Sequence, residues 1–528
     1  MSAVPVSTRV MNLARFLTNQ AERQPDAPGF VWGERVWSWA ELEERVAALA
    51  AVLVEEYGVR PGERVLVQSA NCNQLFESMF ACFRAGAVWV PANFRLSAED
   101  VAGLAQSSGA RGLICGAQFT GHAEACARVL PADGFIIAIG AADFGPDIDD
   151  LIARHRDAPA PHARVDRDDP AWFFFTSGTT GRPKAAVLTH GQLAFVMNNH
   201  LCDLMPGTGP DDASIVVAPL SHGAGIHQLA QTAAGAKTIL PAGEKFDPEA
   251  VWEMVEHWRV TNAFTVPTIL KMLVEHPAAQ ARDHSSLRYV IYAGGPMYRA
   301  DQITALEVLG PKIVQYFGLG EVTGNITVLP PAHHSADDAR MRIGTCGFAR
   351  TGMEVQIQDD EGFDLPRGET GEICVIGPAV FAGYHDNPEA NAKSFRDGWF
   401  RTGDLGHMDA EGFVYITGRA SDMFISGGSN IHPREIEEKA LEHPDISEVA
   451  VVGVPDPVWG EIGVAVCVAR AGADPAAIDL EGWLAERIAR YKMPRAVHYW
   501  EALPKSAYGK TPKPMIRKEL ARRGQMPE

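Results

Sequence analysis

The sequence predicts an α/β protein, and two observations carry this prediction. In the first half of the chain, short apolar runs typical of buried strands alternate with longer amphipathic segments typical of helices. After about Gly344 the chain changes to short strands separated by turns such as Glu361-Gly362 and Glu411-Gly412. We therefore expect a large unit of βαβ type with largely parallel sheets, then a small unit resembling a β-barrel, then a compact α+β tail.

The alternation is clear from residue 64 onward. Segments 64–68 and 87–91 read as buried strands, and 73–84 between them reads as a helix. Ser97 with Asp100 three residues later is typical of a helix cap. Farther along, we expect a helix at 250–258 and strands at 214–220, 263–266 and 289–292. Ligands of such parallel sheets bind outside the carboxyl ends of the strands.

The second half predicts two smaller units. Strands are expected at 355–358, 371–376 and 413–417, with tight turns between them. The tail predicts helices at 434–442 and 480–490 and strands at 449–454 and 464–469. We place the boundary between Thr417 and Ser421. It divides the chain into a large domain, 1–418, and a small domain, 419–528.

Composition and charge narrow the classes of function. The 528 residues are 46% hydrophobic and 21% charged, which is typical of a soluble protein with several domains. A net charge of −19 without a long basic run argues against nucleic acid as the main partner. The eight cysteines form no C-x-x-C pair, so we expect reduced, mostly buried thiols. With neither an apolar run of membrane length nor a leader pattern, we expect a cytoplasmic protein.

The loop from Thr176 to Lys184, between two apolar runs, carries the strongest chemical pattern. Glycines let backbone N–H groups approach an oxyanion closely, hydroxyls add donors and a lysine adds positive charge. The residues expected to contact a polyphosphate are Thr176, Ser177, Gly178, Thr179, Thr180, Gly181 and Lys184. The loop is not a common P-loop, because Pro183 separates Gly181-Arg182 from Lys184.

This nine-residue string resembles the phosphate loop of the superfamily of AMP-forming acyl-CoA synthetases, luciferases and peptide-synthetase adenylation domains. Residues 316–321, Tyr-Phe-Gly-Leu-Gly-Glu, resemble the family's Y-G-x-T-E motif. There an aromatic ring stacks on adenine, and the glutamate, here Glu321, helps to hold Mg²⁺ together with Thr179. Phe317 stands where the motif has tyrosine. Gly320 stands where it has threonine, so one hydroxyl expected near the AMP phosphate is missing.

Two further segments match sequence motifs that bind the nucleotide in this family. Residues 399–404, Trp-Phe-Arg-Thr-Gly-Asp, match W-[FY]-x-T-G-D, whose aspartate, here Asp404, grips the ribose hydroxyls. Arg419 matches an arginine that also reaches the nucleotide. The resemblance adds Gly294, Gly295, Pro296, Tyr316, Phe317 and Gly318 to the nucleotide site.

The C-terminal string 504–510, Pro-Lys-Ser-Ala-Tyr-Gly-Lys, matches P-K-[ST]-x-x-G-K. It makes Lys510 the expected catalytic lysine, a mobile cation between the substrate carboxylate and the α-phosphate. Gly427 and Gly428 belong to a loop that resembles the lining of the CoA channel. The hinge of the mobile small domain falls on Ser421, where the family usually has lysine or aspartate.

The acyl pocket is also placed by resemblance. His222 corresponds to a residue that borders the acyl pocket and the thiol tunnel, and it joins Thr176, Glu321 and Lys510 as an expected catalytic residue. The expected pocket residues are His222, Gly223, Ala224, Val266, Gly294, Gly318, Leu319, Gly320 and Asn325. Because Gly223, Ala224 and Gly225 are small, we expect a roomy pocket that suits an aryl or medium-chain acid. Asn325 either supplies a polar contact to the acid or turns outward.

The resemblance implies a carboxylic acid–CoA ligase that uses ATP, Mg²⁺ and coenzyme A. The acid is first joined to AMP with release of pyrophosphate, and the CoA thiol then takes the acyl group. Three alternatives stay open: loading of a separate carrier protein, luciferase-like use of the acyl-AMP, and a nucleotide-binding module without catalysis. No pattern fixes the oligomeric state, and a homodimer is compatible with the sequence.

Overall fold

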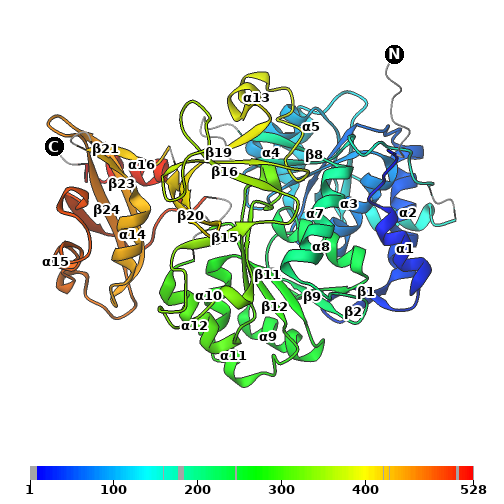
Figure 1. Ribbon diagram of the computed structural model, residues 1–528. Helices are drawn as coiled ribbons and strands as arrows, with labels where there is room; N and C mark the ends of the chain where they lie inside the picture. Colours follow the sequence, from blue (N-terminus) through cyan, green and yellow to red (C-terminus); the bar gives the residue numbers. More distant parts are fainter. Residues whose placement is uncertain are drawn as a thin grey trace, which may run out of the picture.

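The structure is a computed structural model that describes residues 9–157, 160–176, 183–243, 246–295, 297–419, 421–426, 429–506 and 511–526 (Figure 1). Strands in these ranges form sheets of six, fourteen and five strands. The first two sheets, with their helices, make up the body of the molecule. The third forms a lobe at one end of it (Figure 1).

The six-stranded sheet follows the order β6-β5-β3-β4-β7-β8. It is parallel except for β8, which runs antiparallel to β7. Its strands are β3 (Arg64–Gln68), β4 (Val88–Ala92), β5 (Ala110–Gly116), β6 (Phe135–Ile139), β7 (Pro170–Thr176) and β8 (Lys184–Thr189). Its helices are α3 (Asn73–Ala85), α4 (Ala98–Ser108), α5 (Thr120–Ala127) and α6 (Ile148–Arg154). Ser97 caps α4 as expected, because its hydroxyl accepts the Asp100 N–H at 3.2 Å.

The large sheet has a mainly parallel half. Its strands are β1 (Pro28–Trp32), β2 (Arg35–Ser38), β9 (Ala213–Val216), β10 (Lys237–Leu240), β11 (Asn262–Thr265), β12 (Tyr289–Tyr292) and β13 (Ile313–Phe317). The associated helices are α1 (Arg15–Arg23), α2 (Trp39–Ala51), α7 (His190–Asn199), α8 (Gly223–Ala234), α9 (Pro248–His257), α10 (Pro267–Glu275), α11 (Ala278–Ala281) and α12 (Arg299–Leu309). The strand expected at 214–220 is wrong after Val216, because the Asn71 side chain pairs with Ala218 C=O and Leu220 N–H instead of a neighbouring strand.

An antiparallel half continues the same sheet beyond β13. The short strands expected after Gly344 are therefore part of the large sheet. Its elements are β14 (Thr327–Leu329), β15 (Thr345–Ala349), β16 (Glu354–Gln358), β17 (Gly371–Ile376), α13 (Pro388–Ser394), β18 (Phe395–Arg396), β19 (Trp399–Met408) and β20 (Phe413–Arg419). Strand β20 runs two residues past the expected end, because Gly418 and Arg419 still pair with β19.

The end lobe contains the five-stranded sheet. Its elements are β21 (Phe424–Ser426), β22 (Ser429–Ile431), α14 (Pro433–Leu441), β23 (Ile446–Asp456), β24 (Gly460–Ala469), α15 (Leu480–Ala485), β25 (Ala496–Tyr499) and α16 (Lys513–Arg522). The helix expected at 480–490 is too long. It ends at Ala485, because Leu480 and Leu484 complete its buried face and the residues up to Arg490 are mostly exposed charged side chains.

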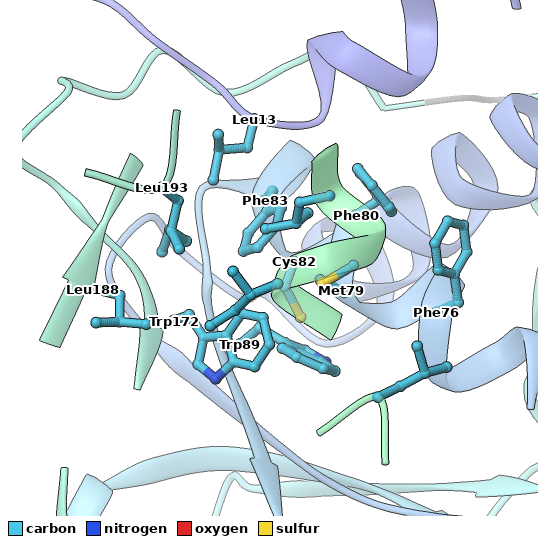
Figure 2. Close-up of a cluster of buried hydrophobic side chains, with 14 of the residues drawn as sticks. Leu13, Phe76, Met79, Phe80, Cys82, Phe83, Trp89, Trp172, Leu188 and Leu193 are labelled. Carbon is cyan, nitrogen blue, oxygen red and sulfur yellow. The ribbon is translucent and has the colours of Figure 1, made fainter. Parts of the chain in front are cut away.

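The main hydrophobic core joins α2, α3, α7 and α8 to strands of both body sheets. Figure 2 shows its centre, where Phe80 and Phe83 of α3 gather with Trp89 and Trp172. The two tryptophan rings meet edge to face at 4.5 Å between centroids, which anchors β7 against β4. All eight cysteines are free thiols and seven of them are buried, as expected from their spacing. Of the helices in the described ranges, none has the length and apolar character that crossing a membrane requires.

Candidate active site

The ends of the expected phosphate loop lie on two paired strands, β7 and β8. Thr176 ends β7, Lys184 begins β8, and the two residues are register partners. Because β7 runs parallel to β4, Thr176 lies at the carboxyl end of a strand, where the sequence places it. Five expected phosphate contacts, Ser177, Gly178, Thr179, Thr180 and Gly181, lie outside the described residues.

Glu321 lies beside the base of this loop. It sits in a single 3₁₀ turn after β13 and is only 5% exposed. The Thr176 hydroxyl donates to its Oε1 at 2.9 Å, and the Tyr384 hydroxyl donates to the same oxygen at 2.9 Å. Both hydrogen bonds that the described part of the chain gives this carboxylate therefore fall on Oε1. The other oxygen, Oε2, is available to a hard cation, so the donor set fits one Mg²⁺ ligand.

Gly320 is surrounded too closely for the threonine of the family motif. A Cβ there would lie 2.6 Å from Cδ1 of the Phe174 ring and 2.9 Å from the Thr176 methyl group. Gly318 is equally restricted, because its Cβ would lie 2.5 Å from the backbone of Gly324. The ring of Phe174 thus occupies the space that a side chain at 320 would need.

We predict that Gly320→Thr destabilises the protein by roughly 1–3 kcal/mol, because the added side chain overpacks against Phe174. Thermal unfolding midpoints of the native protein and the variant measure this effect. The double variant Gly320→Thr with Phe174→Leu should recover part of the loss, since it removes the ring. A single variant as stable as the native protein would contradict the tight packing.

Asp404 and Arg419, which are expected to contact the nucleotide, are register partners on β19 and β20. Arg419 Nε donates to Asp404 Oδ1 at 2.9 Å, and the Asp404 carboxylate is buried while the arginine side chain is 49% exposed. The Asp404 N–H donates to Thr402 Oγ1 at 3.0 Å, which holds the backbone of β19 in place at Asp404. The half-buried Phe317 packs against a cluster that includes residues of both strands.

Tyr316 faces a different environment from its neighbour Phe317. Its buried ring stacks on Phe264, with 6.0 Å between centroids and 21° between planes. The ring of His200 lies 6.1 Å away. Successive residues of a strand point to opposite faces, so the side chains of Tyr316 and Phe317 lie on opposite sides of the sheet. Tyr316 lies on the side of Gly223, whose Cβ would be 3.5 Å from the Tyr316 hydroxyl.

Contacts join several of the expected acyl residues to one another or to shared aromatic neighbours. His222 is the N-cap residue of α8, and its ring meets Phe174 edge to face at 5.4 Å. Its Nδ1 lies 2.9 Å from the Ser221 hydroxyl. Val266 comes close to Gly294, whose Cβ would lie 3.8 Å from Cγ1 of the valine. Ala224 is buried and Leu319 is half-buried, and Gly295, which is expected in the nucleotide site, is exposed.

The side chain of Asn325 is buried, so the possibility that it turns outward to solvent is wrong. It is 0% exposed, and its amide oxygen and nitrogen form no hydrogen bond with the described residues. A buried amide without a partner is unfavourable. Asn325 is therefore suited to bind a polar group of a ligand.

Gly223 and Gly225 do not create open space, so they give no support for the expected roomy pocket. A Cβ on Gly223 would lie 2.8 Å from the Phe264 ring, and one on Gly225 would lie 2.0 Å from the carbonyl oxygen of Leu220 and 2.9 Å from Trp172. These two positions require glycine because aromatic rings and backbone atoms occupy the space that a side chain would need. The walls of this region are aromatic, formed by Phe174, His222, Phe264 and Tyr316.

Sequence reasoning missed Tyr384. It belongs to residues 381–385, here called the strap, which runs along β8. Three backbone hydrogen bonds of 2.9–3.0 Å join the strap to β8, and Phe381 N–H donates to Glu321 C=O at 2.8 Å. The Lys184 ammonium lies 4.9 Å from the centroid of the Tyr384 ring. Nothing in a single sequence marks a tyrosine in a loop as a partner of residues 63 and 200 positions away.

Burial sets the protonation of the surrounding groups. Burial and then the Glu321 carboxylate raise the pKa of Tyr384, so its hydroxyl stays protonated and remains a donor. Burial lowers the pKa of His227, on α8, to about 4, and lowers the pKa of His200 well below its usual range. These two histidines are therefore neutral at pH 7.

The remaining predicted residues are only partly described. Ser421 is exposed and opens a turn in which the N–H groups of Asp422 and Met423 donate to Arg419 C=O at 3.0 and 3.1 Å. Pro296, Gly427, Gly428 and Lys510 lie outside the described residues.

Comparison with known proteins places the chain in a family. Residues 17–385 match the model of the AMP-binding enzyme family, and residues 435–510 match the model of its C-terminal domain. The chain is 37% identical to a feruloyl-CoA synthase from an Amycolatopsis species, over 97% of this chain and all of that protein. It is 35% identical to an indoleacetate–CoA ligase of Aromatoleum aromaticum, over 97% and 99% of the two chains.

A solved structure agrees with this assignment. The o-succinylbenzoate-CoA synthetase of Bacillus subtilis, in complex with its acyl-adenylate intermediate, superposes with a TM-score of 0.85 at 27% identity, over 97% of this chain and 99% of that one. The fold, the family models and the relatives agree. The chain belongs to the AMP-binding enzyme family and is an AMP-forming acyl-CoA synthetase.

Proposed function

We propose that the acid activated by this AMP-forming acid–thiol ligase is an aryl acid. The observation that carries the proposal is the aromatic wall of Phe174, His222, Phe264 and Tyr316, which lies next to Gly320 and Gly223. Flat rings pack against such walls with a geometry that a flexible alkyl chain cannot match. The feruloyl and indoleacetyl groups named for the relatives are aromatic, which supports the same class. A medium-chain acid is less well supported, because the side chains that surround this region are aromatic and not aliphatic.

In the proposed first step, an oxygen of the acid attacks the α-phosphorus of ATP and pyrophosphate leaves. The loop from Thr176 to Lys184 would hold the β- and γ-phosphates, and Lys510 would neutralise charge on the transferring group. Asp404 would accept hydrogen bonds from the ribose hydroxyls, and Arg419 would keep that carboxylate in place. Binding both reactants in one site replaces a large part of the entropy barrier of a bimolecular step.

We assign Mg²⁺ to Glu321 and Thr179 within this site. The buried Glu321 carboxylate offers Oε2, while Oε1 is already held by two hydroxyls. When bound, Mg²⁺ would neutralise phosphate charge and orient the pyrophosphate for departure. Glu321 itself would orient the cation, and Thr176 would orient Glu321.

In the second step, the CoA thiol attacks the acyl-AMP carbonyl, and AMP leaves. We propose that the small domain, 419–528, turns on the large domain, 1–418, about Ser421 between the two steps. This rotation would withdraw Lys510 and bring Gly427 and Gly428 to the thiol path past His222. ATP and CoA are both cytoplasmic metabolites, and we propose that compartment for the reaction.

Acid-dependent exchange of pyrophosphate into ATP, run across a panel of aryl and alkyl acids, tests the proposal. Exchange with cinnamic or indoleacetic acid well above octanoic acid would support it, and the reverse order would refute it. Supplying CoA or a phosphopantetheinylated carrier protein then distinguishes a CoA ligase from a carrier-loading enzyme. Oxygen uptake dependent on acyl-AMP would reveal luciferase-like chemistry, and no exchange with any acid would indicate a non-catalytic module.

We predict that Phe264→Leu lowers kcat/KM for cinnamic acid roughly three- to tenfold and leaves octanoic acid within about twofold, because it removes an aromatic wall. Phe119→Leu is the matched control, since its ring pairs with His122 outside this group. Equal losses for both acids in the Phe264 variant would show that the ring only supports packing.

A further inference from the structure

Tyr384 connects two groups that act on the phosphate side of the site. Its hydroxyl donates to Glu321 Oε1, and its ring lies under the Lys184 ammonium. Glu321 follows β13, Lys184 begins β8 and Tyr384 belongs to the strap. Three segments far apart in the sequence therefore meet at one side chain.

The strap holds this tyrosine in a fixed place. Asn391 accepts the Tyr384 N–H at 2.6 Å and donates to its carbonyl at 3.0 Å. The Phe381 ring packs edge to face against the Tyr384 ring at 4.8 Å. With the backbone bonds to β8, these contacts leave the ring little freedom. The hydroxyl meets Glu321 in one geometry.

Packing alone does not require the hydroxyl. A phenylalanine would fill the same buried volume and keep the contacts with Lys184 and Phe381. The hydroxyl adds the bond to Glu321, a carboxylate that is 5% exposed, and an interaction with the Ser394 side chain at the end of α13. With Thr176 on the same oxygen, that bond fixes the rotation of the carboxylate and hence the direction in which Oε2 points.

We propose that Tyr384 is a positioning residue for the cation of the first half-reaction: it holds Glu321 so that Oε2 faces the metal that accompanies ATP. This inference rests on the proposed assignment of Mg²⁺ to Glu321. Partners that orient a metal ligand typically change metal affinity by about 10–100-fold when removed. Tyr384 is expected to act in this way, without contact with the metal or the phosphates.

Calorimetric titration of ATP, once with excess Mg²⁺ and once with EDTA, measures how much the metal strengthens ATP binding. In Tyr384→Phe this Mg²⁺-dependent gain in affinity should fall by about tenfold, while the EDTA titration stays close to native. The half-saturating Mg²⁺ concentration for pyrophosphate exchange should rise in parallel. The gain compares two dissociation constants from one preparation, so a small loss of folded protein cancels.

The matched control is Tyr415→Phe. Tyr415, on β20, also has a hydroxyl that donates a hydrogen bond to a carboxylate, here that of Asp409 at 3.1 Å. Its Mg²⁺-dependent gain should equal the native value. A native gain in Tyr384→Phe, or equal weakening of ATP binding with and without Mg²⁺, would overturn the role of Tyr384 alone. A native protein whose ATP binding ignores Mg²⁺ would instead refute the magnesium assignment, and this inference with it.

Discussion

Lys510→Ala is expected to lower acyl-AMP formation by about a hundredfold to a thousandfold and to leave thioester formation from supplied acyl-AMP largely intact. In the first half-reaction, negative charge builds up on the oxygens around the α-phosphorus. A lysine is a point charge on a flexible stem, suited to follow that charge. In the second half-reaction the leaving group is AMP, and the proposed rotation has already withdrawn the lysine.

The two half-reactions are measured separately. Pyrophosphate exchange reports the first, and release of acyl-CoA from synthetic acyl-AMP reports the second. Lys518→Ala is the control, because Lys518 is an exposed lysine on α16 near the same end of the chain. If Lys510→Ala reduced both half-reactions to the same extent, the proposed role of Lys510 would be wrong.

The bounds of a strand were predictable from the sequence where an apolar run ends abruptly. The strands at 64–68, 289–292 and 371–376 have the predicted bounds, because apolar runs end there at polar, glycine or turn residues. The strand at 214–220 failed because the competing partner, Asn71, lies 147 and 149 positions away. No local pattern reports such a partner.

The candidate site divides in the same way. The motif strings name Thr176 and Glu321, and Asp404 and Arg419, and the fold brings each pair into hydrogen-bond contact. A sequence motif does not predict which residues of distant segments will contact its members in the folded protein. The small residues from Gly223 to Gly225 suggested open space, but aromatic rings and backbone atoms lie next to both glycines. Tyr384 was missed for the same reason, because its importance lies entirely in its contacts.

The second large effect concerns pH. Four buried histidines, His190, His200, His227 and His334, have pKa values lowered mainly by burial. The pKa is about 4 for His190, His227 and His334, against about 6.5 in an unfolded chain. Between these values the unfolded chain binds more protons than the folded one, so stability is fully present above about pH 6.5 and is lost as the pH falls toward 4.

We therefore expect the free energy of unfolding to fall by several kcal/mol between pH 7 and pH 4.5, with about 3 kcal/mol as the upper contribution of one such histidine. Urea unfolding midpoints across this range measure the slope. His190→Phe should flatten the slope by up to one proton, since the His190 ring packs edge to face on Phe83 and its Nε2 has no partner among the described residues. His257→Phe, the same change at an exposed position, should leave the slope unchanged. A slope as steep in His190→Phe as in the native protein would show that His190 takes up no proton when the chain unfolds.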